Sequence, residues 1–333
     1  MHINFNLSKK ILSWYDNNKR SLPWRVSKRS SKKLYYRLLS EFMLQQTQVK
    51  TVIPYFNNFT KKYKTLEALS KSNHKEILKM WEGLGYYRRA KNLLKCSKQL
   101  VNEYKLRLPK TLDEIKQLPG IGEYTGNALL GLVHDKPTIA LDGNVKRVFS
   151  RILNKEESKI DFKRFIENNK KNLFSTKRNA DFVEALMEFG ALICKPKNPI
   201  CNNCNLKKNC KYSKSSNKIK NTKFIMIKNK NYDVFCYVNN KKQIALTKNN
   251  ELGFLNKLNL PEIRETKNNN KTNSWKFLKS YKNSISNKKL NINLYYKFSN
   301  KIPPSFNWYS LDKNEEFIPT FTKKIFRQVS ILF

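Results

Sequence analysis

Four cysteines within seventeen residues constrain this chain more than any other feature of its sequence. Thiolates grouped in this way select zinc, cuprous copper or an iron–sulfur cluster, and one Cys-x2-Cys pair alone would leave that choice open. The spacing of six, two and five intervening residues differs from the paired motifs of zinc knuckles and from the ferredoxin runs. At this density, unrelated free thiols are a poor explanation. The four positions are Cys194, Cys201, Cys204 and Cys210.

The charge of the chain points to a polyanion as its partner. The sequence contains 67 Lys and Arg against 25 Asp and Glu, which gives a net charge of +42. Nucleic acid is the first candidate and an anionic membrane surface a distant second, although part of the lysine and asparagine content fills linkers. Five lysines crowd the cysteine loop and predict a basic surface there: Lys195, Lys197, Lys207, Lys208 and Lys211.

The length of 333 residues allows two domains of ordinary size, each with its own core. No apolar run approaches the roughly 18 residues that span a bilayer, and the amino terminus lacks a signal-peptide core. The two remaining cysteines, Cys96 and Cys236, lie far apart in the sequence. Because this usage of cysteine fits a reducing compartment, we expect a cytoplasmic protein.

A carboxylate lies in line with the apolar face of a helix that is predicted from Leu34 to Val49. Leu34, Leu38, Glu41 and Gln45 recur at helical spacing and share one face. If that face is buried, desolvation raises the pKa of Glu41 toward neutrality, as a general acid requires. Without further context, the alternative is a solvated glutamate that pairs with a lysine.

Two glycine-containing segments predict tight backbone beside helices. In Leu118–Gly126, Gly120 and Gly122 flank one apolar residue before an apolar helix, so backbone N–H groups can bind a phosphate without reading base sequence. In Trp81–Tyr87, the glycines permit a tight turn and the aromatic side chains can stack on bases. As a bare aromatic residue, Tyr86 would more often belong to a core.

These segments together resemble the helix-hairpin-helix DNA glycosylases, in the branch of endonuclease III and adenine DNA glycosylase (MutY). The resemblance covers residues 5–212 almost continuously. Ser40–Thr47 is similar to the Ser-Glu-x-Met-Leu-Gln-Gln-Thr helix of the adenine branch, whereas endonuclease III has no acidic residue at the glutamate position. The resemblance implies that the four cysteines hold one 4Fe–4S cluster, which orders its loop and does not cut the glycosidic bond. A structural zinc is the alternative.

The same resemblance assigns roles in DNA binding. It implies that Glu41 is the general acid and base, that Gln46 and Thr47 enter the duplex beside the damaged guanine, and that Tyr86 wedges into the base stack. Glu184 matches a position that hydrogen-bonds the extruded base, although the preceding Val183 departs from the usual polar residue. Further contacts with substrate or DNA are expected from Arg25, Leu84, Gly120 and Gly122.

Tyr124 indicates the type of reaction. Bifunctional relatives carry a lysine at this position, whose amine forms a Schiff base with the sugar and then cleaves the strand, and a tyrosine cannot do this. Asp142 is suitably placed as a helix N-cap. In its Leu-Asp-Gly-Asn-Val context it also matches an aspartate that family members use against positive charge on the deoxyribose, with Asn144 helping to position the reacting groups. Only the fold can bring Asp142 and Glu41 together as the carboxylate pair that glycosidic cleavage uses.

The carboxy-terminal part has a different pattern. Residues 213–223 have linker composition, and beyond them the apolar period changes toward two. This part loosely resembles the MutT-like domain of adenine glycosylases, which recognises 8-oxoguanine; of its Phe-Ser-His recognition loop, Asn283–Asn287 retains only Ser286. No glutamate-rich pyrophosphohydrolase box is present, so this domain should bind and not hydrolyse. Strands are predicted at Phe224–Ile227, Tyr232–Val238 and Gln243–Lys248, and a terminal helix at Glu315–Leu332.

The sequence therefore predicts a mostly α helix-hairpin-helix glycosylase domain over residues 1–212 with its iron–sulfur loop at 194–210, a linker at 213–223, and a smaller α+β MutT-like, or Nudix-like, domain over 224–333. It predicts a monofunctional adenine DNA glycosylase that acts on adenine paired with 8-oxoguanine or guanine in double-stranded DNA. We expect a monomer in the bacterial cytoplasm, bound to the nucleoid through DNA and to no membrane. The alternatives are an endonuclease III-like glycosylase and lyase on oxidised pyrimidines, a DNA-binding protein that has lost catalysis, and a zinc-stabilised nucleic-acid binder.

Overall fold

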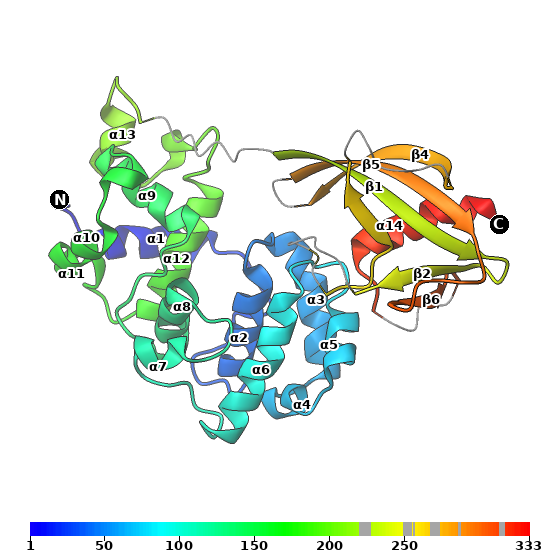
Figure 1. The fold of residues 1–333 in the computed structure, drawn as a ribbon. Coiled ribbons are helices and arrows are strands. Elements are labelled where there is room, and N and C mark those ends of the chain that lie inside the picture. Colours follow the sequence, from blue (N-terminus) through cyan, green and yellow to red (C-terminus); the bar gives the residue numbers. More distant parts are fainter. Residues whose placement is uncertain (220–227, 249–254, 256, 267–273, 286–287, 313–316) are drawn as a thin grey trace. The chain divides into compact units, whose positions relative to one another are not determined.

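The chain forms two compact units (Figure 1). A computed structural model describes residues 1–219, 228–248, 255, 257–266, 274–285, 288–312 and 317–333. The first unit consists of Met1–Ile77 and Tyr86–Thr222, and the second of Leu78–Gly85 and Lys223–Phe333. The first unit is helical, and the second contains a β-sheet with a helix near its carboxyl end. The predicted order of a mostly helical part followed by an α+β part is confirmed.

Residues 1–219 contain short and medium helices joined by tight turns. Their core includes the edge-to-face pair of Trp14 and Phe189, whose ring centroids lie 5.1 Å apart, and the tilted pair of Phe149 and Phe165. In chain order the helices are α1 (Leu7–Asn18), α2 (Lys33–Leu44), α3 (Val49–Lys62), α4 (Leu66–Ser70), α5 (His74–Met80), α6 (Arg88–Asn102), α7 (Leu112–Lys116), α8 (Glu123–His134), α9 (Gly143–Leu153), α10 (Phe162–Asn168), α11 (Lys170–Leu173), α12 (Asn179–Leu192) and α13 (Lys211–Lys214).

Helix α2 is shorter than its sequence predicts. The expected helix to Val49 is wrong beyond Leu44, because the chain turns there through Gln46, whose φ of 58° is left-handed, before α3 begins. Carbonyl groups in the last turn of α2 accept hydrogen bonds from the side chain of Arg89. Such a contact from a distant helix replaces the backbone bonds that would continue the helix, and the local sequence does not reveal it.

The predicted glycine turn joins α7 to α8. Gly120 has a φ of 82°, and a Cβ atom there would lie 2.7 Å from Asn92 and 2.9 Å from Phe42, so both the backbone conformation and the packing require glycine. Gly122 is the N-cap of α8, has extended backbone, and borders open space. The first N–H groups of α8 therefore meet no N-cap side chain.

The second unit is built on a mixed sheet. Its described strands are ordered β4-β5-β1-β2-β6, with β3 also paired to β1; β1 and β5 are parallel, and the other pairs are antiparallel. Helix α14 lies against the sheet (Figure 1). The side chain of Lys324 in α14 donates to Asn283 of β4 at 2.8 Å. The elements are β1 (Lys228–Asn239), β2 (Gln243–Thr247), β3 (Glu262–Glu265), β4 (Lys276–Ile285), β5 (Lys288–Phe298), β6 (Phe306–Ser310) and α14 (Thr320–Val329).

The sequence located two of these strands but misplaced the start of the last helix. Tyr232–Val238 lies within β1 and Gln243–Lys248 corresponds to β2, whereas Phe224–Ile227 lies outside the described residues. The terminal helix begins at Thr320, after the non-helical residues 317–319, because Pro319 disfavours helical backbone in the residue before it; Glu315, where the sequence predicts the start, lies outside the described residues. Among the described helices, none combines the length and apolarity needed to cross a membrane.

Candidate active site

Glu41 is a buried carboxylic acid on α2, as its helical spacing predicts. The residue is 4% exposed, and among the described residues no hydrogen-bond donor reaches its Oε2 atom. Burial raises the pKa of Glu41 to about 7, although the neighbouring Arg37 guanidinium and Tyr124 hydroxyl oppose the shift. Glu41 can therefore exist in both protonation states near neutral pH, and one of its oxygens is free to meet a ligand.

Asp142 caps the amino end of α9, which confirms its predicted structural role. Its Oδ1 accepts from the backbone N–H of Val145 at 2.7 Å, and its Oδ2 accepts from Asn144 Nδ2 at 2.8 Å. Burial raises the pKa of Asp142, and these donors oppose the shift by stabilising the anion. Asn144 is itself held, because Arg147 Nη2 donates to its Oδ1 at 2.8 Å.

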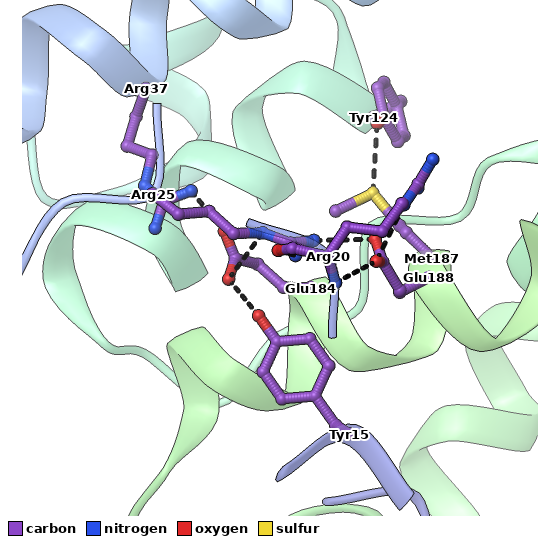
Figure 2. Close-up of polar contacts among 8 residues, drawn as sticks. All are labelled: Tyr15, Arg20, Arg25, Arg37, Tyr124, Glu184, Met187 and Glu188. Carbon is purple, nitrogen blue, oxygen red and sulfur yellow. Dashed lines mark hydrogen bonds and ion pairs between the residues drawn. The ribbon is translucent and has the colours of Figure 1, made fainter. Parts of the chain in front are cut away.

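The fold brings the two carboxylates and Tyr124 into one site. Glu41 and Asp142 lie within electrostatic range of each other, although 101 residues separate them in the sequence. Burial raises the pKa of the Tyr124 hydroxyl far above its usual value, and both carboxylates add to the shift. The hydroxyl donates to Met187 Sδ at 3.3 Å (Figure 2). A neutral phenol therefore lies within electrostatic range of both acids.

Glu184 on α12 is the centre of a buried polar network (Figure 2). Its Oε2 accepts from the hydroxyl of Tyr15 at 2.5 Å and lies 3.4 Å from Arg25 Nε, while its Oε1 accepts from Arg37 Nη1. The sequence predicts that Glu184 hydrogen-bonds the extruded base. In this structure both of its oxygens already have protein donors, so a base would have to share or replace them.

Glu188 is a further buried carboxylate, for which the sequence predicted no role. It is 3% exposed and accepts from Arg20 through the backbone N–H at 2.9 Å, Nε at 2.8 Å and Nη2 at 2.9 Å. Arg25 Nη2 donates to it at 2.7 Å, so Arg25 lies within this network. Although burial opposes it, the hydrogen bonds from Arg20 and Arg25 hold the pKa of Glu188 at about 2. The sequence does contain a pattern that could have indicated this buried carboxylate, because two glutamates lie four residues apart in the otherwise apolar stretch Phe182–Phe189.

The residues predicted to enter DNA differ in exposure. Gln46 is exposed, and Tyr86 is 43% exposed; both have left-handed backbone, with φ of 58° and 49°. The Oγ1 atom of Thr47 accepts from Arg89 Nη2 at 3.0 Å. Leu84 is only 6% exposed because its side chain is part of the core, so this structure does not present it to DNA. Ser286 lies outside the described residues.

The four cysteines of the loop line one hollow and form no disulfide with one another. Arg151 of α9 also lines it and donates to Cys194 Sγ at 3.4 Å, to the carbonyl of Lys195 at 2.6 Å and to that of Pro196 at 2.9 Å. Within the described ranges, no three or more His, Cys, Asp or Glu side chains are grouped closely enough to hold a metal ion. The thiols therefore surround a space and do not converge on one point.

The chain is similar in sequence and in fold to known DNA glycosylases. The profile of the HhH-GPD superfamily base excision DNA repair proteins matches residues 39–171. An adenine DNA glycosylase of Buchnera aphidicola subsp. Baizongia pistaciae is 36% identical over 341 residues, which cover 96% of this chain and 95% of that protein. The human adenine DNA glycosylase is 36% identical over 208 residues, which cover 60% of this chain and 38% of the human protein. Among solved structures, a thermostable thymine-DNA glycosylase superposes with a TM-score of 0.54 at 28% identity, covering 62% of this chain and 94% of that one.

Proposed function

The chain belongs to the adenine DNA glycosylase family of the HhH-GPD superfamily, and we propose that it hydrolyses the N-glycosidic bond of adenine paired with 8-oxoguanine or guanine in duplex DNA. The match to a relative named adenine DNA glycosylase extends over 96% of the chain. The observation that supports the chemistry best is the buried Glu41, whose pKa is about 7 and whose Oε2 has no donor among the described residues.

Glu41 is the proposed general acid and base. An adenine inside a duplex is inaccessible, so the nucleotide is extruded into the site before reaction. The protonated carboxyl donates its proton to N7 of the purine, which makes adenine a better leaving group. The resulting carboxylate then accepts a proton from the attacking water. A pKa near 7 suits both steps, because neither protonation state is costly at neutral pH.

Asp142 is the proposed partner for the sugar. Departure of adenine leaves positive charge on the deoxyribose, and a nearby carboxylate stabilises that charge. The hydrogen bonds from Val145 and Asn144 favour the anionic form of Asp142 against the effect of burial. Because Asn144 is held by Arg147, it fixes the direction in which the Asp142 carboxylate points.

Tyr124 supports a monofunctional reaction. A lyase step requires an amine that attacks C1′ of the sugar, and Tyr124 provides a buried, neutral phenol. We expect the products to be free adenine and an intact strand with an abasic site. Covalent trapping with borohydride should therefore give no adduct of protein and DNA, and a trapped adduct would instead support the lyase alternative.

The four loop cysteines are proposed to hold one 4Fe–4S cluster. Such a cluster carries its four thiolates on four iron atoms, so it needs a space between the cysteines, and the hollow that they line fits this need. The guanidinium of Arg151 beside Cys194 suits the negative charge of ligated thiolates. When bound, such a cluster would order residues 194–210 through these four ligands, and no step of bond cleavage is assigned to it. Purified protein should be brown and contain iron and sulfide; a colourless protein that contains zinc would contradict the assignment.

The remaining domain assignments are part of the same proposal. Residues 1–212 would form the glycosylase domain, 213–223 a linker, and 224–333 a MutT-like domain that recognises 8-oxoguanine. The near full-length match to the Buchnera protein and the mixed sheet with α14 support a second domain of this kind. The open amino end of α8 after Gly122 suits binding of a DNA phosphate.

The test is excision of adenine from matched duplexes that differ only in the opposing base. Under single-turnover conditions, we expect the fastest release opposite 8-oxoguanine and guanine and little release opposite thymine. All four opposing bases must be compared at one stated salt concentration, because a protein with a net charge of +42 binds any duplex when salt is low. Release at equal rates from all four duplexes, or no release of adenine, would contradict the proposal.

A further inference from the structure

Arg89 of α6 is a buried arginine that closes the carboxyl end of the helix that carries Glu41. It is 7% exposed, and its Nη1 atom donates to the carbonyl oxygens of Phe42 at 3.1 Å, Met43 at 2.7 Å and Gln45 at 2.5 Å. Its Nη2 atom donates to Thr47 Oγ1 at 3.0 Å. These carbonyls lie at the negative end of the helix dipole and lack partners within α2, so a guanidinium fits there both as donor and as charge.

The same arginine holds Tyr86. The backbone N–H of Arg89 donates to the carbonyl of Tyr86 at 2.8 Å, and its guanidinium lies 5.3 Å from the centroid of the tyrosine ring. One side chain therefore links two segments that are forty residues apart in the sequence. Both segments end in exposed side chains, those of Gln46 and Tyr86.

Gln46 and Tyr86 both have left-handed backbone, which is costly for residues other than glycine. Such conformations persist only where the surrounding structure imposes them. The side chain of Arg89 contacts the residues on both sides of Gln46, and its guanidinium lies over the ring of Tyr86. Contacts of this kind would hold the exposed side chains of Gln46 and Tyr86 at a fixed distance from each other.

We infer that Arg89 is a positioning residue that makes Gln46 and Tyr86 one rigid two-part probe, which enters the base stack and replaces the extruded nucleotide. This inference rests on the proposed function, because it describes how the adenine leaves the duplex before Glu41 acts. Without the arginine, the two turns relax independently toward ordinary backbone, and the probe is assembled only part of the time. Loss of Arg89 should therefore slow the extrusion of the nucleotide and leave proton transfer by Glu41 unchanged.

The test replaces Arg89 by lysine, which keeps the charge but cannot reach four acceptors at once. Arg88→Lys is the matched control, because Arg88 is the preceding residue of the same helix and is exposed. Three quantities are measured for each protein: the single-turnover rate on a duplex with adenine opposite 8-oxoguanine, the affinity for an undamaged duplex, and the extrusion of 2-aminopurine placed at the target position. Extrusion is read as a rise in fluorescence in a Glu41→Gln background.

For Arg89→Lys we expect the excision rate and the fluorescence rise to fall together by roughly 10- to 100-fold, as the competent conformation becomes a minor one. Affinity for undamaged duplex should stay within about twofold, and the pH midpoint of excision should not move, because both effects leave the phosphate contacts and Glu41 intact. The control should match the wild-type protein. If Arg89→Lys yields no folded protein, Arg89→Gln carries the same test with the same expected losses, because the shorter glutamine side chain keeps an amide donor but cannot reach all the acceptors of Arg89.

Two results would overturn the inference. One is a wild-type excision rate in the folded variant. The other is full extrusion of 2-aminopurine together with a loss of excision, which would place the defect in the chemistry. Failure of the proposed function would look different, because the wild-type protein itself would then release no adenine.

Discussion

Replacing Glu41 by glutamine should make this protein more stable and inactive. Burial holds the pKa of Glu41 at about 7 in the folded state, against its ordinary value of 4.5. Between these two pH values the folded protein binds the proton more tightly than the unfolded chain does. The contribution of Glu41 to stability therefore decreases as the pH rises from 4.5 to about 7, and above this range the folded protein carries the full cost of a buried carboxylate.

The size of this cost follows from the shift in pKa. One pKa unit corresponds to about 1.4 kcal/mol, so the carboxylate destabilises the fold by about 3 kcal/mol at pH 8 and by less than about 1 kcal/mol at pH 5. Glutamine has nearly the same shape and never ionises. The free energy of unfolding of Glu41→Gln should thus exceed that of the wild type by about 3 kcal/mol at pH 8, and the difference should shrink toward pH 5.

Urea unfolding at both pH values measures the difference, and single-turnover excision measures the activity. Loss of the general acid should lower the excision rate by at least about 100-fold, while affinity for duplex DNA is kept. A variant that is less stable than the wild type at pH 8 would refute the argument that burial raises the pKa. Excision retained at the wild-type rate would refute the catalytic role of Glu41.

Three further predictions test other parts of the site. Gly120→Ala should destabilise the protein by about 1 to 3 kcal/mol in urea unfolding, because it places a Cβ atom against Asn92 and Phe42 at positive φ; an unchanged midpoint would contradict the packing at this turn. Asp142→Asn keeps an N-cap, so melting should change little while single-turnover excision falls by at least about tenfold; parallel loss of both would mean that the cap is its main role. Tyr124→Lys places an amine beside the sugar, and borohydride should then trap a covalent adduct that the wild type does not form; no adduct would show that residue 124 does not reach the sugar.

The sequence predicted those parts of the site that depend on local patterns. Helical spacing located Glu41 on a buried face, because a 3.6-residue period determines which side chains share the core side of a helix. The cap at Asp142 also followed from neighbouring residues alone. In both cases the residues that determine the structure lie within one or two turns of each other.

The remaining features depend on contacts between distant segments. The end of α2 at Leu44 depends on hydrogen bonds from Arg89. The residues that follow, Gln45-Gln46-Thr47, include neither glycine nor proline, so the local sequence does not predict a turn there. The pairing of Glu188 with Arg20 joins residues 168 positions apart, and no local pattern relates them. Sequence periodicity could show that α12 carries buried acids but could not show which arginines neutralise them.

The pH dependence of adenine release by the wild-type enzyme tests the central claim most directly. It is measured as the single-turnover rate on a duplex with adenine opposite 8-oxoguanine, from about pH 5.5 to pH 9 at constant salt. If Glu41 donates the proton that frees adenine, the rate should fall about tenfold per pH unit above a midpoint near 7 and level off below it. A rate that stays constant through pH 9, or that rises above pH 7, would contradict the account.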